Sequence, residues 1–276
     1  MYTIRCVLGS SAQYLASLPA LRHTIKLHYR MSSLPHPLAA VCQVTATPNK
    51  EANFSTCKQL VEDASERGAH MVFLPEGFDY IGSSREETLS LSESLSGDTI
   101  SRYTQLARKL GVWLSLGGFH ERGHDWETDQ RIYNSHIIIN DKGDIVSVYR
   151  KSHLFDVELP EKGVSLKESA FTIPGPSIVS PVQTPIGKVL LRARAIETQC
   201  FVLAAAQVGK HHEKRMSYGH ALAVDPWGEV LGDCGGEKPG MVLVEMDLEK
   251  VNRTRRNMPV QQHRRDVAFY HVLDQT

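Results

Sequence analysis

The pattern of apolar and polar residues changes its period several times along the chain, beginning at Leu38. The run Leu38–Thr45 is almost entirely apolar and predicts a strand that is buried on both faces. The spacing of the next apolar residues predicts a helix, with Thr47 as its N-cap and Gly68 as its C-terminal stop. Residues 71–74 predict a second buried strand, and residues 99–110 predict an amphipathic helix. Strands that alternate with helices in this way predict an α/β fold.

Later in the chain the pattern predicts antiparallel hairpins. Residues 132–139 and 145–149 read as two strands joined by a turn of Asn, Asp, Lys and Gly. Residues 217–224 and 229–231 read as another pair, joined by an Asp-Pro-Trp-Gly turn. Hairpins that follow strand–helix alternation predict mixed sheets, and no repeat or linker divides the chain into further domains.

The first 36 residues have a different composition from the rest. No Asp or Glu occurs between Met1 and Lys50, whereas arginine, lysine and serine recur there. Such a composition is typical of a mitochondrial transit peptide, and the alternative is a basic leader without an address. We therefore expect a leader, residues 1–36, outside a single globular domain, residues 37–276. Met31 could serve as an internal start that leaves a cytoplasmic form, so we expect the mitochondrion, the cytoplasm or both.

Charge and cysteine content exclude several classes of protein. The chain has 31 Lys and Arg against 31 Asp and Glu, so no electrostatic argument exists for nucleic acid or an anionic membrane as partner. A membrane-spanning helix needs about 18 consecutive apolar residues, and no apolar run in the sequence approaches that length. The five scattered cysteines form no CxxC pair, which indicates a reducing compartment without structural zinc. Adjacent histidines point apart, so we read His211-His212-Glu213 as an exposed loop rather than a metal site.

Three charged residues stand where predicted strands give way to loops. Lys151 follows the strand 145–149, Glu76 follows the strand 71–74, and Glu168 lies further along the loop that Lys151 opens. A lysine fixed at such a point can act as a cation beside a reacting carbonyl, and both glutamates could converge on it. The alternatives are a solvated lysine at a strand end and an ordinary salt-bridge cluster.

Five motifs in this order resemble successive motifs of the nitrilase superfamily of carbon–nitrogen hydrolases, over about residues 38–266. They are Leu74-Pro-Glu76, Tyr149-Arg-Lys151-Ser-His-Leu154, Lys167-Glu-Ser169, Arg192-Ala-Arg-Ala-Ile-Glu197 and Asp225-Pro-Trp-Gly228. Residues 117–123 and 211–215 resemble one branch of it, which implies an amidase for small omega-amide acids such as a deaminated peptide amide. The resemblance also implies a four-layer α-β-β-α sandwich whose sheets pack face to face, and a homodimer.

The resemblance further implies a Glu-Lys-Cys triad with a second glutamate. Glu76 would be the general base that removes the thiol proton and later activates water. Lys151 would stabilise the oxyanion, and Glu168 would help to position the substrate. The cysteine of such a site attacks an amide carbonyl, ammonia leaves, and water hydrolyses the thioester. Neither a metal nor an organic cofactor is implied.

The cysteine of this triad is missing from the chain. In the family it closes a strand between the second glutamate and the Arg-Ala-Arg-Ala helix, but here no cysteine lies between Glu168 and Cys200. Residues 185–189, which should begin that strand, run directly into the helix 190–197 without an N-cap or a turn residue. Relative to the family roughly forty residues are absent, about the size of one strand–helix–strand unit. The remaining cysteines do not stand at a strand end beside Glu76 and Lys151; they include Cys42, Cys57, Cys200 and Cys234.

Two classes of function follow from this departure. The chain is either an amidase by family that has lost its nucleophile, most simply as a splice variant or a gene-model product, and is inactive. Or it is a non-catalytic member that binds a partner or pairs with the full-length subunit. In either case we expect the domain to be incomplete around residues 189–190.

Overall fold

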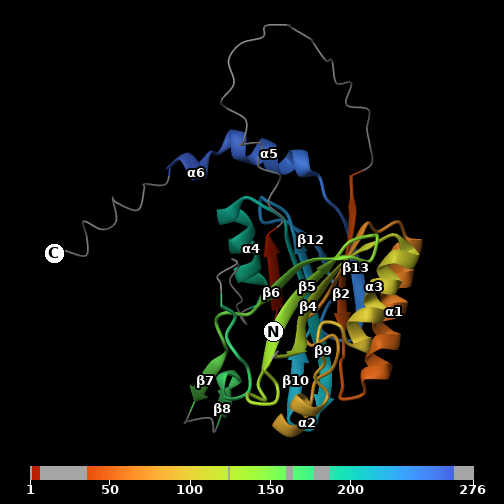
Figure 1. The fold of residues 1–276 in the computed structure, drawn as a ribbon. Coiled ribbons are helices and arrows are strands. Elements are labelled where there is room, and N and C mark those ends of the chain that lie inside the picture. Colours follow the sequence, from red (N-terminus) through yellow and green to blue (C-terminus); the bar gives the residue numbers. More distant parts are fainter. Residues whose placement is uncertain (1, 7–35, 124, 160–163, 177–186, 264–276) are drawn as a thin grey trace, which may run out of the picture.

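In the computed structural model a mixed β-sheet runs through the molecule and helices cover its outer faces (Figure 1). The structure describes residues 2–6, 36–123, 125–159, 164–176 and 187–263. The helices are α1 (Lys50–Glu66), α2 (Arg85–Ser90), α3 (Asp98–Leu110), α4 (Gly187–Thr198), α5 (Leu248–Asn257) and α6 (Val260–His263). The strands are β1 (Tyr2–Cys6), β2 (Leu38–Val44), β3 (Met71–Leu74), β4 (Trp113–Arg122), β5 (Ile132–Ile139), β6 (Ile145–Arg150), β7 (Asp156–Leu159), β8 (Val164–Lys167), β9 (Val202–His212), β10 (Arg215–Tyr218), β11 (Leu222–Val224), β12 (Val230–Asp233) and β13 (Gly240–Glu245).

The main sheet has two halves, one built around β9 and the other running from β2 to β6. Its eleven strands follow the order β12-β11-β9-β2-β3-β4-β5-β6, while β1 and β10 also pair with β9 and β13 pairs with β2. The two halves are joined where Gln43 pairs with Ala206 and Val44 pairs with Gln207. Strands β2, β3 and β4 are parallel, and β5 and β6 continue the sheet antiparallel, as the hairpin pattern predicts.

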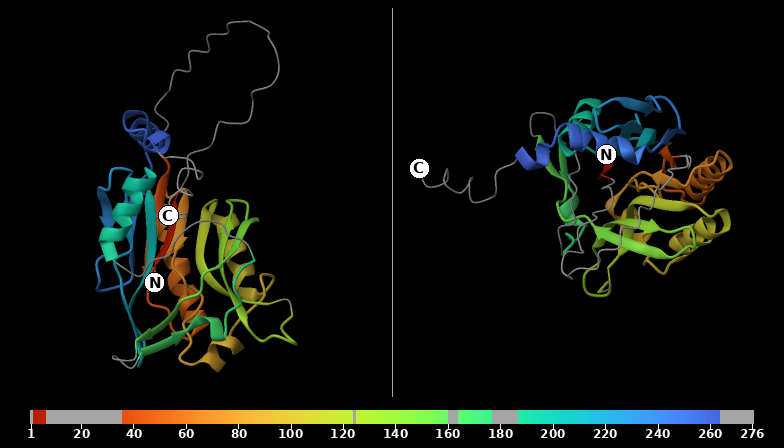
Figure 2. Two further views of the ribbon diagram at one scale, coloured as in Figure 1. Left: turned by 90° about the vertical axis from the view of Figure 1, so that its left-hand side faces the viewer. Right: turned by 90° about the horizontal axis from the view of Figure 1, so that it is seen from above.

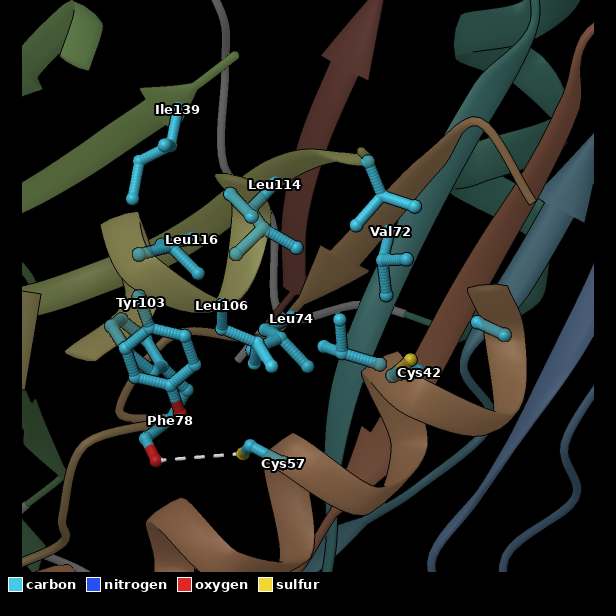
Figure 3. Packing of buried hydrophobic residues seen from close by; sticks show 14 of the residues in the cluster. Cys42, Cys57, Val72, Leu74, Phe78, Tyr103, Leu106, Leu114, Leu116 and Ile139 are labelled. Atoms are coloured by element: carbon cyan, nitrogen blue, oxygen red, sulfur yellow. Dashed lines mark hydrogen bonds between the residues drawn. The ribbon is translucent and has the colours of Figure 1, made fainter. Parts of the chain in front are cut away.

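Alternate residues of β2 face two different cores, because successive side chains of a strand point to opposite faces. Ala40 and Cys42 pack toward α1 and α3, in the cluster that Figure 3 shows from close by. Ala39 and Val41 pack instead against residues of β9 and β11 from the other half of the sheet. Helices α4 and α5 cover that second half, while α1 and α3 cover the first (Figure 2). The predicted α-β-β-α layering is therefore confirmed.

The first helix begins later than the sequence predicts. Helix α1 has Asn49 as its N-cap, whose side chain accepts a hydrogen bond from the Ala52 N–H at 3.0 Å. The Thr47 hydroxyl, which we expected to cap the helix, accepts from the Asn49 N–H at 3.2 Å instead. Both residue types can cap, and the prediction failed because the Thr47 amide is held by the buried Asn53 side chain. The predicted stop is confirmed, since Gly68 has φ +83°.

Two segments depart from the expected domain boundaries. Residues 2–6, which we expected to lie outside the fold, form β1 and pair antiparallel with β9 from Val202 to Ala206. Residues 7–35 lie outside the described part of the chain, so the transit peptide stays a prediction. Residues 187–189, which we expected to open a strand, are the first turn of α4. Because no turn residue precedes Leu190, the helix extends toward the N-terminus and begins at Gly187. Across the described residues, no helix is long and apolar enough to cross a membrane.

Candidate active site

Lys151 lies directly after β6 and is buried. Its backbone N–H donates to the carbonyl oxygen of Asn134 at 2.8 Å, which extends the β5–β6 pairing by one residue. The residue is 8% exposed, and its Nζ donates to Oε2 of Glu168 at 2.7 Å. A buried ammonium is costly unless it is paired. The reading of Lys151 as a solvated strand-end lysine is therefore wrong.

Glu168 begins a short 3-10 turn, Glu168–Ala170, that follows β8. Its Oε2 accepts two hydrogen bonds, from Lys151 Nζ and from the Phe155 N–H, the latter at 2.6 Å. The loop on which it sits is closed by Asp156, which accepts from the backbone and the hydroxyl of Ser169. Those two hydrogen bonds hold the pKa of the Asp156 carboxyl below its usual range. The carboxylate of Glu168, near the end of this loop, is thus held by Lys151 and Phe155 from the beginning of the loop. The hydrogen bonds between Asp156 and Ser169 keep the two ends of the loop together.

Glu76 follows β3 and enters the site from the neighbouring strand. Its Oε1 accepts a hydrogen bond from Nδ2 of Asn134 at 2.7 Å. Its backbone carbonyl accepts from Nε2 of Gln207 in β9 at 3.0 Å, so that the second half of the sheet also holds this residue. All three predicted site residues are brought together, through direct contact or through one shared partner.

The shared partner is Asn134, which sequence reasoning missed. The same Nδ2 that donates to Glu76 also donates to Oε1 of Glu168 at 3.3 Å. A second missed feature is the glycine pair in β4. A Cβ added at Gly118 would collide with Oδ1 of Asn134 and lie 2.8 Å from Cγ of Glu76, and one at Gly117 would collide with the Pro75–Glu76 backbone. The signal available beforehand was Gly-Gly at the end of an apolar strand, which marks a close approach.

A buried ion pair supports the strand end that carries Lys151. The Arg150 guanidinium donates to both carboxylate oxygens of Glu121, and Ser135 donates to the same carboxylate. The side chain of Glu121 is 2% exposed. Hydrogen bonding to that carboxylate raises the pKa of Arg150. Because Arg150 precedes Lys151, this fork fixes the direction in which the chain leaves β6.

The cysteines that the structure describes in atomic detail lie in cores and turns. Cys42 and Cys57 pack between the sheet and α1, where Cys57 Sγ approaches the carbonyl oxygen of Phe78 at 3.8 Å (Figure 3). Burial raises the pKa of the Cys57 thiol to about 12 and that of the half-buried Cys234 to about 11. Cys200 is fully buried and contacts the Thr198 hydroxyl. The thiols of Cys42, Cys57 and Cys234 therefore stay protonated near neutral pH, so they are poor nucleophiles.

His211 is not in an exposed loop, contrary to the sequence prediction. It lies one residue before the end of β9 and is 5% exposed, with Nδ1 bonded to the carbonyl oxygen of Ala46 and Nε2 to the Ser217 hydroxyl, each at 2.7 Å. Burial lowers its pKa. The prediction failed because β9 is longer than its apolar run, so strand pairing with β10 carries the histidine into the interior.

The family assignment follows from comparison with known proteins. The sequence model of the carbon-nitrogen hydrolase family matches residues 38–191 and 188–256. The chain belongs to the carbon–nitrogen hydrolase family. It is similar to the deaminated glutathione amidases of Bos taurus, at 49% identity over 91% of this chain and 88% of the relative, and of Homo sapiens, at 50% over 85% and 84%. The crystal structure of the Caenorhabditis elegans NitFhit protein superposes with a TM-score of 0.76, at 38% identity over 84% of this chain and 65% of that one.

The same comparisons show a break in the match to the family near residue 190. The family match comes in two pieces that meet at residues 188–191. The alignment with the bovine relative runs over 293 positions, but 91% of the 276 residues of this chain is only about 251 residues. In total about 42 aligned positions of that relative therefore have no counterpart in this chain.

The arrangement can do part of amide hydrolysis. Glu76 offers a carboxylate that can act as a base, and Lys151 offers a fixed positive charge for an oxyanion. Both groups are positioned before any substrate binds, so little reorganisation is needed. Among the described cysteines, burial raises the pKa of Cys42, Cys57 and Cys234, which does not favour a thiolate nucleophile.

Proposed function

We propose that Glu76, Lys151 and Glu168 form the amide-hydrolysing site of a carbon–nitrogen hydrolase that acts on small omega-amide acids such as deaminated glutathione. The observation that carries the proposal is the convergence of these residues, through the 2.7 Å bond from Lys151 to Glu168 and the shared donor Asn134. The substrate class is supported by relatives of about 50% identity that are deaminated glutathione amidases.

In a complete site of this kind, Glu76 takes the proton of the cysteine thiol and the thiolate bonds to the amide carbon. The Lys151 ammonium stabilises the negative carbonyl oxygen that results. The C–N bond then breaks, and the proton held by Glu76 leaves with the nitrogen as ammonia. Water next attacks the thioester, Glu76 takes its proton, and the carbon–sulfur bond breaks to give the acid and the free thiol. Glu168 keeps Lys151 in place throughout, since they are directly bonded.

We propose further that this chain does not turn over, because the segment with the nucleophile is absent at residues 189–190. The support is the absence of cysteine between Glu168 and Cys200, together with the family match that divides at residues 188–191. Splicing or gene-model error is the simplest origin of such a loss. Without the nucleophile, a base and a cation leave only modest residual catalysis.

The second candidate is a non-catalytic subunit that pairs with itself or with a full-length copy. Large apolar side chains on the β9–β12 half favour it, because they stand in solvent in the single chain. Met216 is 75% exposed, Tyr218 66% and Trp227 57%. Exposed apolar and aromatic groups of this size are common in protein interfaces.

The decisive experiment measures ammonia release from a small omega-amide acid by the purified chain and by a version with the strand–helix–strand unit restored. We expect no release from the chain itself, and release from the restored version that both iodoacetamide and Glu76→Gln abolish. Release by the unaltered chain that Glu76→Gln removes would contradict the proposed loss of activity. Restored turnover that is indifferent to iodoacetamide would contradict the thiol mechanism. Co-purification of a tagged chain with the restored version would support the pairing role.

A further inference from the structure

Asn134 contacts all three of the predicted site residues, the carboxylates of Glu76 and Glu168 and the backbone of Lys151. It projects from β5, between Glu76 after β3 and Glu168 after β8. Its backbone carbonyl accepts from the Lys151 N–H at 2.8 Å, and its side-chain nitrogen donates to Glu76 at 2.7 Å and to Glu168 at 3.3 Å. Because both donor distances end on one atom, the two carboxylate oxygens are no more than about 6 Å apart.

We propose that Asn134 is a positioning residue that holds the carboxylates of Glu76 and Glu168 in place, by giving one amide proton to each. An amide nitrogen has two protons, and here each meets a different acceptor. This inference rests on the proposed site only in treating the two glutamates as site residues.

The orientation of the amide is set by its surroundings. If the amide were flipped, its oxygen would face two carboxylates, and three oxygens would repel one another. Where Oδ1 does lie, it packs so closely on Gly118 that a Cβ at that position would collide with it. The amide is therefore held by carboxylates on one side and by bare backbone on the other.

The division of protons has a consequence for Glu76. Asn134 donates to Oε1 of that carboxylate, which fixes the orientation of the Glu76 side chain. Oε1 of Glu168 accepts from the same amide nitrogen, while Oε2 of Glu168 accepts from Lys151. Asn134 thus sets which oxygen of each glutamate accepts the amide hydrogen bond.

The first test is spectroscopic and uses the full chain labelled with nitrogen-15 asparagine. The two side-chain protons of Asn134, identified by their loss in Asn134→Leu, should give separate resonances. Glu76→Gln should move one of them and Glu168→Gln the other. A residue that only fills space would not show this pattern. Both resonances moving together in a single variant, or neither moving, would overturn the proposal.

The second test exchanges donor and acceptor across the 2.7 Å bond. Asn134→Asp has nearly the same shape but replaces the donor by a third carboxylate, so we expect the melting temperature to fall by about 6 °C or more. In the double variant Asn134→Asp with Glu76→Gln, the residue at position 76 becomes the donor and the residue at position 134 the acceptor. This double variant should recover at least half of the lost melting temperature.

The matched control is Asn252, which donates to Glu249 at 3.1 Å on the exposed face of α5. Asn252→Asp should lower the melting temperature by less than about 2 °C, because solvent screens exposed charges. Equal losses in Asn134→Asp and Asn134→Leu, without recovery by Glu76→Gln, would show a packing role and overturn the proposal. Neither test measures turnover, so a failure of the proposed amidase activity leaves their outcome unaffected.

Discussion

At the scale of single residues, the site is a balance of donors and acceptors in a nearly closed space. The side chains of Lys151 and Glu168 are only 10% and 13% exposed, so solvent contributes little to either charge. The hydrogen bonds to Glu168 come from the side chains of Lys151 and Asn134 and from the Phe155 N–H. Small changes of volume or charge here should therefore have large effects.

Gly118 offers a direct test of this crowding. Gly118→Ala should destabilise the chain by about 1–3 kcal/mol, because the new methyl group collides with Asn134 Oδ1 and crowds Glu76 Cγ. Gly240→Ala in β13 is the control, since a Cβ there meets nothing within 4 Å. Urea unfolding of both variants measures the difference. If the two variants unfolded at the same urea concentration, the claim that Gly118 packs closely against Asn134 and Glu76 would be wrong.

The thiols supply another prediction at this scale. Burial raises the pKa of Cys57 to about 12 and that of Cys234 to about 11, so at pH 8 iodoacetamide should label both far more slowly than a free thiol of pKa about 8.5. A raised pKa means that thiolate appears only as pH rises, so labelling of Cys234 should increase about tenfold per pH unit up to about pH 11. Peptide mass spectrometry follows each site. Fast labelling of Cys57 or Cys234 at pH 7 would show that one of them is an activated thiol after all.

At the scale of elements, the antiparallel strands β4, β5 and β6 place Lys151 and Asn134 side by side. The pairing of β4 with β5 shifts register between Leu116 and Phe119, where the two glycines lie. The irregularity lets β4 bend past Glu76 without breaking the sheet. At the far end of β6, the fork between Arg150 and Glu121 ties the last residue of one strand to β4.

Removing that fork should loosen the strand end. Arg150→Met leaves the carboxylate of Glu121 buried without its cation, and we expect a loss of about 3 kcal/mol in the free energy of unfolding. Adding Glu121→Gln should recover most of it, because the uncompensated charge is gone. Arg131→Met, which breaks a fork to Asp129 at the surface, should change stability by less than about 1 kcal/mol. Chemical denaturation provides the values, and an equal effect at both forks would argue against burial as the cause.

At the scale of the whole molecule, the half of the sheet around β9 is joined to the other half by a short pairing. Its edge toward β2 is paired through two residues of β2 and through β1, a strand from the very start of the chain. A unit inserted at residues 189–190 would interrupt the first turn of α4, a helix that packs on β9 and β11.

Restoring the unit should raise stability as well as activity. Interior strands bury aliphatic side chains worth about 1.5–3 kcal/mol each, although ordering the added residues offsets much of that gain. We expect a higher urea midpoint and a larger m-value, because more surface is buried on folding. Unchanged values for both would mean that the described fold is already complete without the unit.

The leader gives the remaining prediction. Residues 1–30 fused to a fluorescent reporter should direct it to mitochondria, because arginine and serine without acidic residues are typical of transit peptides. The chain begun at Met31 should remain in the cytoplasm. If the reporter with the full leader stayed in the cytoplasm, the prediction of a transit peptide would be wrong.

The sequence by itself determined most of the central strands and helices, and it pointed to the three charged residues that the fold brings together. Hydrophobic period and turn chemistry depend on near neighbours, so the hairpin across residues 140–143 and the turn from Asp225 to Gly228 were predicted correctly. Strand ends placed Glu76 and Lys151 correctly, because a loop begins where an apolar run stops. The absence of cysteine between Glu168 and Cys200 can likewise be read from the sequence alone.

Tertiary structure alone decided how those residues are held. Asn134 reaches its two glutamates across 58 and 34 residues of sequence, and no local pattern distinguishes it from other asparagines in strands. The burial of His211 and the backward extension of α4 likewise depend on which strands and helices lie alongside. A side chain that can donate to many partners is assigned one only when packing brings a particular acceptor within reach.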